Sequence, residues 1–332
     1  MKQKSNFQLK DITTFHIPAI ASQYYEYDNV EELKQILNNN KNIEMLHIGG
    51  GSNLLFTKDY DGIILHSNIK FIEEIDDADD SVILKVGSGV VWDEFVKYCV
   101  DHLYYGTENM SYIPGEVGAS AVQNIGSYGT EVKDIISKVH TIDVRTLKER
   151  TFNNEECDYA YRYSIFKGEL KGKYIVTSVE YKLSKTKILN LTYGLLKAIN
   201  NPNLTLKDVR EEIIRIRTAK LPDPKYIGSA GSFFKNPIVS TEKFIALSNI
   251  YPQMPHYVVG ENEYKIPAGW LIENAGLKGC SIGDAQVYPK QCLVIVNNGN
   301  AKGEDVVKLF THIIDTVNDK YSIILDPEAN II

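Results

Sequence analysis

A segment of small residues in the last third of the chain holds a serine in a setting that suits chemistry. Residues 228–237 read GSAGSFFKNP, and Ser232 stands between small residues and two phenylalanines. Small side chains let a ligand come close to the backbone, and aromatic rings can shield a hydroxyl from water. A glycine-rich surface turn with an incidental serine would have the same sequence, so the segment gains weight only from other parts of the chain.

A run of three glycines is the second candidate. Residues 45–48 (MLHI) predict a short apolar strand, and residues 49–53 (GGGSN) follow it directly. A strand that ends in glycines can present several backbone N–H groups to an anion, which is how proteins hold a pyrophosphate. A tight turn that binds nothing is an equally good interpretation of this loop alone. The loop consists of Gly49, Gly50, Gly51, Ser52 and Asn53.

This loop lacks the fingerprint of a Rossmann domain. The third glycine of the G-x-G-x-x-G pattern is missing, and residues 57–62 (TKDYDG) predict a turn where the long helix of that fold would begin. An NAD-binding Rossmann domain is therefore disfavoured.

Strand and helix patterns alternate along the chain around these candidates. Asn29 precedes apolar residues at helical spacing and predicts an N-capped helix, with Glu32 at the capping-box position. Residues 84–89 (LKVGSG) predict a strand and a loop, and an apolar stripe at helical spacing follows, which we expect to pack in a core. The stripe consists of Trp92, Phe95, Val96, Cys99, Val100 and Leu103.

Residues 112–129 form a long segment dense in glycine and small polar residues. Irregular segments of this length inside compact domains are usually functional or disordered, and the apolar content of this one argues against disorder. It is therefore a third candidate for the site.

The overall composition limits the class of protein. A chain of 332 residues exceeds one ordinary core, so we expect two or three domains. A formal net charge of −7 argues against a broad nucleic-acid surface, which needs clustered Lys and Arg. The four cysteines have no C-x-x-C spacing, so neither a zinc site nor a redox pair is indicated. No apolar run is long enough to span a bilayer, and the cytoplasm is the expected location.

Four segments, taken in order, resemble the family of UDP-N-acetylenolpyruvoylglucosamine reductases, flavoenzymes of bacterial peptidoglycan synthesis. They are the triple-glycine loop, the P-G-x-x-G-x-x-x-x-Q-N-x-G-x-Y-G pattern of residues 114–129, the YRYSIFK segment of residues 161–167 and the decapeptide 228–237. The resemblance runs from the TTF sequence at residues 13–15 to the DPE sequence at residues 326–328. Four matches in the family's order are far more specific than one glycine loop.

The resemblance implies a fold that mixes α and β structure. The N-terminal two-thirds would form the two-part FAD-binding fold shared with vanillyl-alcohol-oxidase-like enzymes, and the C-terminal third an α/β substrate-binding domain. The expected boundaries are residues 1–70 and 71–218 for the two FAD-binding subdomains and 219–332 for the substrate-binding domain. The final segment would return Glu328 to the active site.

The resemblance also implies that FAD is bound without a covalent link and that NADPH donates the electrons. The loops at residues 49–53 and 114–129 would cradle the FAD pyrophosphate and lie along the isoalloxazine, and Arg217 would lie near the flavin phosphates. Nothing in the sequence marks an NADPH pocket, so NADPH over NADH rests on the resemblance alone. His47 is expected to be a strand residue rather than a flavin contact. The other residues expected at the cofactor are Pro114, Gly115, Gly118, Ala119, Gln123, Asn124, Gly126, Tyr128 and Gly129.

Three residues take catalytic roles by motif matching. Ser232 would donate a proton to the carbon next to the substrate carboxylate, where hydride addition leaves enolate character. Arg162 would contact that carboxylate with its planar guanidinium, although its tyrosine neighbours also suit a stacked structural arginine. Glu328 would lie across from Arg162 and share a proton with the carboxylate or orient a water. A charged residue in solvent is the alternative for Glu328.

Residues 191–194 (LTYG) resemble the substrate loop of the larger of two subtypes in the family, in which a tyrosine folds over the nucleotide sugar. Tyr193 is therefore the expected lid residue. Further contacts to the diphosphate and uracil are expected by position in the family, and an ordinary surface or interface role stays open for each. These residues are Lys220, Asn236, Tyr257, Lys278 and Gln291.

Two other functions remain open at this point. A flavin oxidase on the same fold would have no need of the Ser232 and Glu328 pair, and a non-catalytic flavin-binding module would bind FAD without turnover. A serine hydrolase is disfavoured because no G-x-S-x-G elbow surrounds Ser232 and no histidine lies in a segment that suggests a paired base. We expect a monomer that acts on a small nucleotide sugar, with neither nucleic acid nor membrane as a partner.

Overall fold

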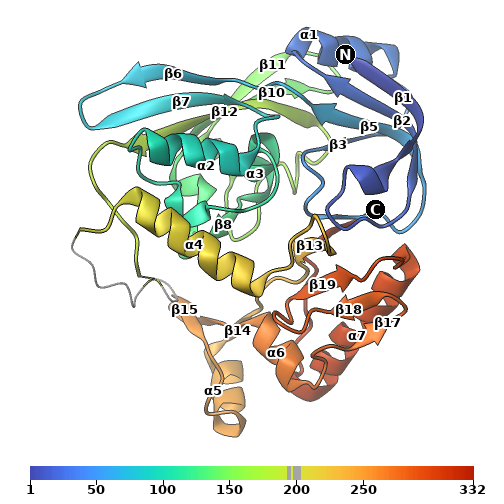
Figure 1. Ribbon diagram of the computed structural model, residues 1–332, viewed down its shortest axis with the longest axis vertical. Coiled ribbons are helices and arrows are strands. Elements are labelled where there is room, and N and C mark those ends of the chain that lie inside the picture. Colours follow the sequence, from blue (N-terminus) through green and yellow to red (C-terminus); the bar gives the residue numbers. More distant parts are fainter. Residues whose placement is uncertain (193–195, 197–202) are drawn as a thin grey trace. The chain divides into compact units, whose positions relative to one another are not determined.

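The structure is a computed structural model of the chain, and it describes residues 1–192, 196 and 203–332 (Figure 1). Contacts between residues divide the chain into two compact units, each described by itself. Both units mix helices with sheets, in agreement with the predicted fold class. The three-domain division expected from the sequence stays a prediction. Unit 1 comprises Met1–Phe7, Ala21–Gly51 and Asp61–Ala219, and unit 2 comprises Gln8–Ile20, Ser52–Tyr60 and Lys220–Ile332.

A four-stranded sheet in the order β1-β2-β5-β3 and the helix α1 (Val30–Asn39) form one part of unit 1. The predicted cap is confirmed, since the Asn29 side chain accepts a 2.9 Å hydrogen bond from the Glu32 N–H. The Glu32 carboxylate accepts from the N–H of Asp28 at 2.9 Å, one residue before the cap, so the reciprocal capping box is not formed. The strands are β1 (Lys2–Gln8), β2 (Ile20–Tyr27), β5 (Tyr60–Ser67) and β3 (Met45–Ile48).

Helix α1 buries one apolar face in a small core. Leu33, Ile36 and Leu37 lie three and four residues apart, which places them on one side of a helix. They pack in one cluster with Tyr27 of β2 and Leu65 of β5. Strand β3 leads into the glycine loop, and its parallel pairing with β5 holds it in the sheet.

A five-stranded antiparallel sheet in the order β11-β10-β12-β7-β6 forms the other part of unit 1. The helices α2 (Trp92–Asp101) and α3 (Val117–Gln123) lie against it (Figure 1) and bury a shared core with its strands. The strands are β11 (Glu149–Asn153), β10 (Ile136–Asp143), β12 (Tyr174–Ser184), β7 (Ser81–Gly87) and β6 (Ile72–Asp77).

The apolar stripe predicted for residues 92–103 is buried except at its last member. Trp92 is fully buried, and its indole N–H donates to the Met110 carbonyl at 2.9 Å. Leu103 is 61% exposed, so the prediction was wrong for this residue. The helix ends at Asp101, and Leu103 takes a left-handed conformation with φ of 58°, which turns it out of the stripe.

Shorter elements and one long helix complete unit 1. Helix α4 (Leu206–Lys220) packs through Val209, Ile213 and Ile216 against Leu196 and Leu204. The hairpin strands β8 (Gly126–Ser127) and β9 (Thr130–Glu131) pair with each other. Single turns of 3₁₀ helix lie at η2 (Glu108–Met110), η3 (Val132–Asp134) and η4 (Asn154–Cys157).

Unit 2 contains a four-stranded sheet in the order β13-β19-β18-β17, a three-stranded sheet in the order β14-β16-β15 and the parallel pair β4 and β20. Its helices are α5 (Thr241–Ile250), α6 (Ala268–Asn274) and α7 (Gly303–Tyr321), and the 3₁₀ turn η1 spans Leu9–Asp11. The strands are β13 (Gly228–Ser232), β19 (Val294–Asn297), β18 (Ala285–Val287), β17 (Ser281–Ile282), β14 (Ile238–Ser240), β16 (Glu263–Lys265), β15 (Tyr257–Gly260), β4 (Leu54–Leu55) and β20 (Asn330–Ile331).

Helix α7 supplies much of the core of unit 2. Its residues Val306, Leu309, Ile313 and Val317 follow helical spacing and are fully buried. They form one cluster with the two phenylalanines that follow β13. The apolar packing of these two phenylalanines against α7 therefore anchors the strand that ends at Ser232.

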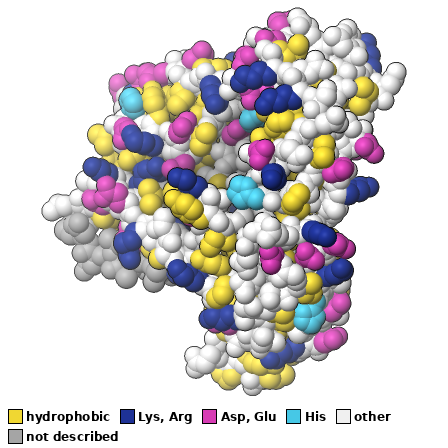
Figure 2. All heavy atoms as spheres, turned by 45° about the vertical axis from the view of Figure 1, so that its right-hand side comes forward, with side chains coloured by type: hydrophobic (Ala, Val, Ile, Leu, Met, Phe, Trp, Pro, Cys, Tyr) yellow, Lys and Arg dark blue, Asp and Glu magenta, His cyan; other side chains and the backbone are white. Residues whose placement is uncertain are grey.

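Acidic and basic side chains are interspersed over the face shown in Figure 2. Among the described residues, no helix is long and apolar enough to cross a membrane. No group of three or more His, Cys, Asp or Glu side chains within the described ranges is placed to hold a metal ion. Cys99, Cys157 and Cys292 are buried thiols, and Cys280 is partly buried.

Candidate active site

In unit 1, the structure brings two of the predicted cofactor segments into contact. A Cβ built on Gly49 would lie 3.0 Å from the Cβ of Ala119, and one on Gly50 would lie 3.4 Å from the Cα of Gly115. Gly51 has a φ of 61°, and its N–H donates to the Gly49 carbonyl at 2.7 Å. Any larger residue at position 49 would push the loop away from α3, so the contact depends on glycine.

The start of α3 is held equally closely on its other side. A Cβ on Gly118 would lie 2.8 Å from the Cβ of Ser88 in the loop after β7. Ser88 is buried, and its hydroxyl is 2.7 Å from the hydroxyl of Ser67 at the end of β5. The glycine loop, the loop after β7 and the start of α3 therefore form one close-packed cradle in unit 1.

The second half of the predicted cofactor segment is shaped by Asn124. This residue is fully buried with a φ of 45°, and its side-chain amide donates to the Ala160 carbonyl at 2.8 Å. Its side-chain carbonyl accepts from the Lys133 N–H at 3.1 Å. A Cβ on Gly126 would lie 2.5 Å from the Thr130 carbonyl oxygen, so the β8–β9 hairpin requires glycine there. Tyr128 also has a positive φ, of 47°.

Arg162 is anchored on this same loop. Its guanidinium donates to the carbonyls of Gly126 at 2.7 Å and Asn124 at 3.3 Å, and it forms an ion pair with Glu131 at 3.4 Å. It also lies over the Tyr161 ring at 5.1 Å, so the stacking foreseen as an alternative is present. The residue has a φ of 55°, which is strained for an arginine. The catalytic role of Arg162 stays a prediction.

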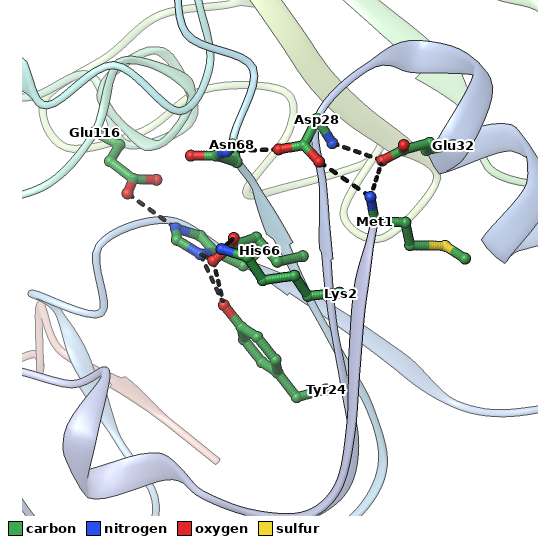
Figure 3. A network of polar contacts seen from close by, with 9 residues as sticks. Met1, Lys2, Tyr24, Asp28, Glu32, His66, Asn68 and Glu116 are labelled. Atoms are coloured by element: carbon green, nitrogen blue, oxygen red, sulfur yellow. Dashed lines mark hydrogen bonds and ion pairs between the residues drawn. The ribbon is translucent and has the colours of Figure 1, made fainter.

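Glu116 and His66 also lie at the cradle, and sequence reasoning missed both. The carboxylate of Glu116 is buried beside Gly49, and one of its oxygens is 2.9 Å from Nε2 of His66 (Figure 3). The other oxygen, Oε2, is buried and has no hydrogen-bond partner among the described residues. A signal was available, because a glutamate between Gly115 and Gly118 is an unusual charge in a segment expected to approach a pyrophosphate.

His47 is a strand residue, as predicted. It lies in β3, and its Nε2 is 2.8 Å from the hydroxyl of Tyr27. Burial lowers the pKa of His47 to about 3, so the ring is neutral near pH 7 and can accept the phenol proton.

Arg217 lies in α4, where its Nε donates to the Tyr112 carbonyl at 3.2 Å. Burial lowers the pKa of Arg217, and the nearby Tyr128, Asp93 and Tyr112 act in the opposite direction. The side chain is therefore tied to the irregular segment 112–129 that was expected at the flavin.

In unit 2, the structure brings the segments of Ser232 and Glu328 into contact through the backbone. Ser232 ends β13, and the next residue, Phe233, accepts a 2.7 Å hydrogen bond from the N–H of Glu328. Lys235 extends the pairing, since its N–H donates to the Asp326 carbonyl at 2.9 Å. Asn53 joins the same group, because its side-chain amide donates to the Glu328 carbonyl at 3.1 Å.

The two phenylalanines after Ser232 belong to the core rather than to the surface around the hydroxyl. Phe233 is 0% and Phe234 1% exposed, and their ring centroids are 5.2 Å apart. Phe233 also contacts Phe310 of α7 at 5.3 Å between centroids. Their rings anchor the segment, while Ser232 itself is only partly buried.

Two of the predicted substrate contacts meet at the start of α6. The Asn236 side chain accepts from the Ala268 N–H at 2.9 Å, and the Gln291 side-chain oxygen would lie 2.9 Å from a Cβ built on Gly269. Lys278 is half exposed and pairs with Glu273 at 2.7 Å.

The remaining predicted substrate contacts lie on other elements or outside the described residues. Lys220 is exposed at the end of α4, and Tyr257 is 38% exposed at the start of β15. Tyr193 lies outside the described residues.

Comparisons with known proteins cover the whole chain. Residues 223–332 match the family described as the C-terminal domain of UDP-N-acetylenolpyruvoylglucosamine reductase, and residues 21–146 match the FAD binding domain family. The UDP-N-acetylenolpyruvoylglucosamine reductase of Bacteroides fragilis is 49% identical over 335 residues, which is 100% of both chains. The enzyme of the same name from Flavobacterium johnsoniae is 46% identical over 337 residues, again 100% of both chains.

The fold also resembles that of a solved structure over nearly the full length. The UDP-N-acetylenolpyruvylglucosamine reductase from Thermus caldophilus superposes with a TM-score of 0.70 at 23% identity, covering 99% of this chain and 98% of that chain. Together with the two family matches, this likeness confirms the predicted combination of an FAD-binding fold with a C-terminal α/β domain.

Proposed function

Because the chain belongs to the UDP-N-acetylenolpyruvoylglucosamine reductase family, we propose that it reduces the enolpyruvyl group of that nucleotide sugar to the lactyl ether of UDP-N-acetylmuramate. The reaction is FAD-dependent, takes its electrons from NADPH and makes a peptidoglycan precursor. The observation that carries the proposal is the 49% identity with the Bacteroides fragilis reductase over the full length of both chains. The family resemblance is confirmed, while the subtype with the tyrosine loop stays a prediction.

The cradle in unit 1 fits a bound FAD. Because Gly49 and Gly50 carry no side chain, the backbone of this loop packs directly against Ala119 and Gly115, and Oε2 of Glu116 is buried there without a partner among the described residues. We propose that the loops at residues 49–53 and 114–119 hold the pyrophosphate, with backbone N–H groups among the donors, and that the loop at residues 123–129 lies along the isoalloxazine. Bound FAD would supply the hydride-transfer chemistry between NADPH and the vinyl carbon of the substrate.

Ser232 completes the reduction by protonating the neighbouring carbon. Hydride addition to the vinyl carbon leaves enolate character on the carbon next to the carboxylate, and the proton of Ser232 Oγ goes to that carbon. A serine hydroxyl is a weak acid, but an enolate carbon is a strong base, which makes the transfer feasible. General-acid catalysis of this kind contributes roughly 10²- to 10⁴-fold to the rate.

Arg162 stabilises the charge that develops on the substrate carboxylate. A planar guanidinium is suited to contact two carboxylate oxygens, and a fixed cation needs no reorganisation as charge builds up. The anchoring of Arg162 to two carbonyls and its positive φ support a residue held in place for such a role.

Glu328 acts on the same carboxylate from the other side, by sharing a proton with it or by orienting a water. The backbone pairing of Glu328 with Phe233 supports this role, because it holds the glutamate beside the segment of Ser232. The nucleotide part of the substrate contacts Tyr193, Lys220, Asn236, Tyr257, Lys278 and Gln291.

We further propose that the chain works as a cytoplasmic monomer built from three domains with the boundaries expected from the sequence. Its partners are FAD, NADPH and the nucleotide sugar. The formal net charge of −7 favours small molecules over nucleic acid as ligands.

An anaerobic absorbance experiment tests the proposal. The purified protein should be yellow, and NADPH should bleach the flavin band at about 450 nm within the enzyme's turnover time. Addition of UDP-N-acetylenolpyruvoylglucosamine should restore the band without oxygen and yield one UDP-N-acetylmuramate per flavin.

The alternatives give different results in the same cuvette. A flavin oxidase would regain its colour only when oxygen is admitted, and a non-catalytic flavin-binding module would show no response to either substrate. A colourless protein that takes up no FAD would contradict the proposal as a whole.

A further inference from the structure

A buried carboxylate faces the glycine loop of unit 1, and only one of its two oxygens has a hydrogen-bond partner among the described residues. The side chain of Glu116 exposes 9% of its surface, and its Oε2 lies 3.4 Å from the position of a Cβ on Gly49. This oxygen has no hydrogen-bond partner among the described residues. A buried carboxylate oxygen without a donor is costly, so its orientation toward the loop needs a reason.

Helix capping does not supply that reason. Glu116 occupies the N-cap position of α3, but its side chain makes no hydrogen bond to the first turn of the helix. The side chain turns away from the helix toward Gly49 and Gly50, and its Cγ would lie 3.7 Å from a Cβ on Gly50. A residue that served the helix alone would be Ser, Thr or Asp with its oxygen on the backbone N–H groups.

The orientation of Glu116 is fixed by a histidine from a different strand. Nε2 of His66, near the end of β5, is 2.9 Å from Oε1 of Glu116, and Nδ1 of the same ring is 3.0 Å from the hydroxyl of Tyr24. With its proton on Nε2, the ring donates to Glu116, because a carboxylate oxygen only accepts, and the single phenol proton of Tyr24 is shared between Nδ1 of His66 and Oε2 of Glu26. Burial raises the pKa of Tyr24, which keeps this donor protonated.

Further polar contacts hold the histidine and the tyrosine in turn (Figure 3). The Tyr24 hydroxyl is 3.2 Å from Oε2 of Glu26, and Glu26 is paired with the ammonium of Lys2 at 2.5 Å. The network thus runs from the first strand of the sheet to the glycine loop, all within unit 1. It leaves Oε1 of Glu116 engaged and presents Oε2 to the loop.

A carboxylate oxygen only accepts hydrogen bonds, so the missing partner is a donor. The pyrophosphate proposed for this loop carries no proton and would repel the carboxylate. In FAD, hydroxyl groups flank the pyrophosphate on both sides, on the ribityl chain and on the adenosine ribose. Either hydroxyl is the donor that a carboxylate beside a phosphate site can accept from.

We propose that Oε2 of Glu116 accepts a hydrogen bond from a sugar hydroxyl of bound FAD next to the pyrophosphate, with His66 as the positioning residue. This inference rests on the proposed function, because it takes FAD as the ligand of the cradle. It adds a specific acceptor to a site otherwise built from backbone N–H groups.

The test measures FAD binding to the full-length apo-protein by flavin fluorescence quenching and by calorimetry. Glu116→Gln should raise the dissociation constant of FAD about tenfold or more, since hydrogen bonds to charged groups contribute most. His66 keeps the amide oxygen of this variant on its own side, so the NH₂ group takes the place of Oε2. Glu73→Gln, on exposed β6, is the matched control and should bind FAD like the unaltered protein.

Two ligand fragments identify the hydroxyl. If the donor is on the ribityl chain, Glu116→Gln weakens binding of FMN and leaves ADP-ribose unaffected, and the reverse holds for a ribose donor. Either pattern supports the proposal. Equal or tighter binding of FAD, FMN and ADP-ribose by Glu116→Gln would overturn it and leave a trapped water as the partner of Oε2.

The role of His66 is tested by coupling. His66→Gln should weaken FAD binding several-fold in the unaltered background and have no further effect in the Glu116→Gln background, because it acts through the carboxylate. Additive losses would remove His66 from the positioning role.

A ligand-side measurement avoids any folding defect. The unaltered protein should bind an FAD analogue that lacks the identified hydroxyl with the same loss as Glu116→Gln shows for FAD, and an undiminished affinity would overturn the proposal. If the unaltered protein binds no FAD at all, the proposed function fails. If it binds FAD and only Glu116 proves indifferent, this inference alone fails.

Discussion

The cofactor cradle of unit 1 and the serine–carboxylate pair of unit 2 are held by different kinds of contact. In unit 1, position depends on the size and contacts of side chains: a Cβ on Gly49 would lie 3.0 Å from the Cβ of Ala119, and the Arg162 guanidinium donates to the Gly126 carbonyl beside the cradle at 2.7 Å. In unit 2, a backbone hydrogen bond joins the two segments, because the N–H of Glu328 donates to the Phe233 carbonyl at 2.7 Å. The buried ring of Phe233 then fixes that segment in the core.

Because of this difference, the Ser232 hydroxyl proposed for catalysis in unit 2 is distinct from the backbone contacts that hold its segment. In unit 1, the same residues are proposed for function and hold the local structure. The segments of Ser232 and Glu328 pair through their backbones, and this pairing does not use the Ser232 hydroxyl, so Ser232 can be exchanged with little effect on the fold. The glycines and Arg162 of unit 1 contribute to the local structure themselves. Substitutions there should disturb binding and stability together.

The largest expected effect is that of Ser232→Ala on substrate reduction. Flavin reduction by NADPH should be nearly unchanged, while flavin reoxidation by the enolpyruvyl substrate should slow at least roughly a hundredfold, because the proton donor is lost. Stopped-flow absorbance measures both half-reactions.

Ser229→Ala is the matched control for this variant, since Ser229 lies in the same strand. It should retain both rates. Equal losses in the two half-reactions of Ser232→Ala would remove this hydroxyl from the acid role and would mean that β13 is structurally sensitive after all.

A smaller effect is expected for Arg162→Lys. The ammonium keeps the charge but cannot contact both carboxylate oxygens, so reoxidation by substrate should slow by about tenfold. Because Arg162 also anchors the loop at Gly126, the flavin should be held less tightly as well. Arg215→Lys, an exposed arginine of α4 paired with Glu212, is the control. A variant with weakened FAD binding and a normal rate when saturated would make Arg162 purely structural.

The sequence predicted the family and several local elements better than the contacts that hold distant segments together. Motif order identified the family, and the short strand at residues 45–48, the Asn29 cap and most of the stripe after Trp92 follow from local patterns. Each of these depends on residues close together in the chain, which periodicity and capping rules describe.

Contacts between distant segments were beyond such rules. Nothing local links Glu116 to His66, 50 residues apart, or shows that Phe233 and Phe234 belong to a core with α7. The exposed Leu103 shows the same limit, since the helix ended two residues before it. The partner of a side chain and its burial depend on which distant segments pack against it in the tertiary structure.

A moderate effect on stability and cofactor retention is expected for Gly49→Ala. The new methyl group would meet the Cβ of Ala119 at 3.0 Å, and relief of that contact would shift the loop at a cost of about 1–2 kcal/mol. Thermal unfolding with and without added FAD measures the loss. The compensating variant Gly49→Ala/Ala119→Gly should recover part of the stability and of the FAD affinity. If Gly49→Ala alone has the stability and FAD affinity of the unaltered protein, the cradle tolerates a side chain at this position, and the contrast with unit 2 fails.

The effect that is smallest at neutral pH is a pH dependence that originates in His47, on the strand that leads into the glycine loop. Its folded pKa is lowered to about 3 by burial, whereas an unfolded chain binds the proton at about pH 6.5. Between these values the unfolded state carries more protons, so the contribution of His47 to the free energy of unfolding is fully present above about pH 6.5. It falls as the pH drops, by up to about 1.4 kcal/mol per pH unit.

His47→Gln keeps an acceptor for the Tyr27 hydroxyl and should flatten the dependence of the unfolding free energy on pH between pH 7 and 5, measured by urea unfolding of the apo-protein. His312→Gln, exposed on α7 of unit 2, should leave the slope as it is. An unchanged slope in His47→Gln would mean that protonated His47 is accommodated, and that the strand before the glycine loop is less rigid than its packing indicates.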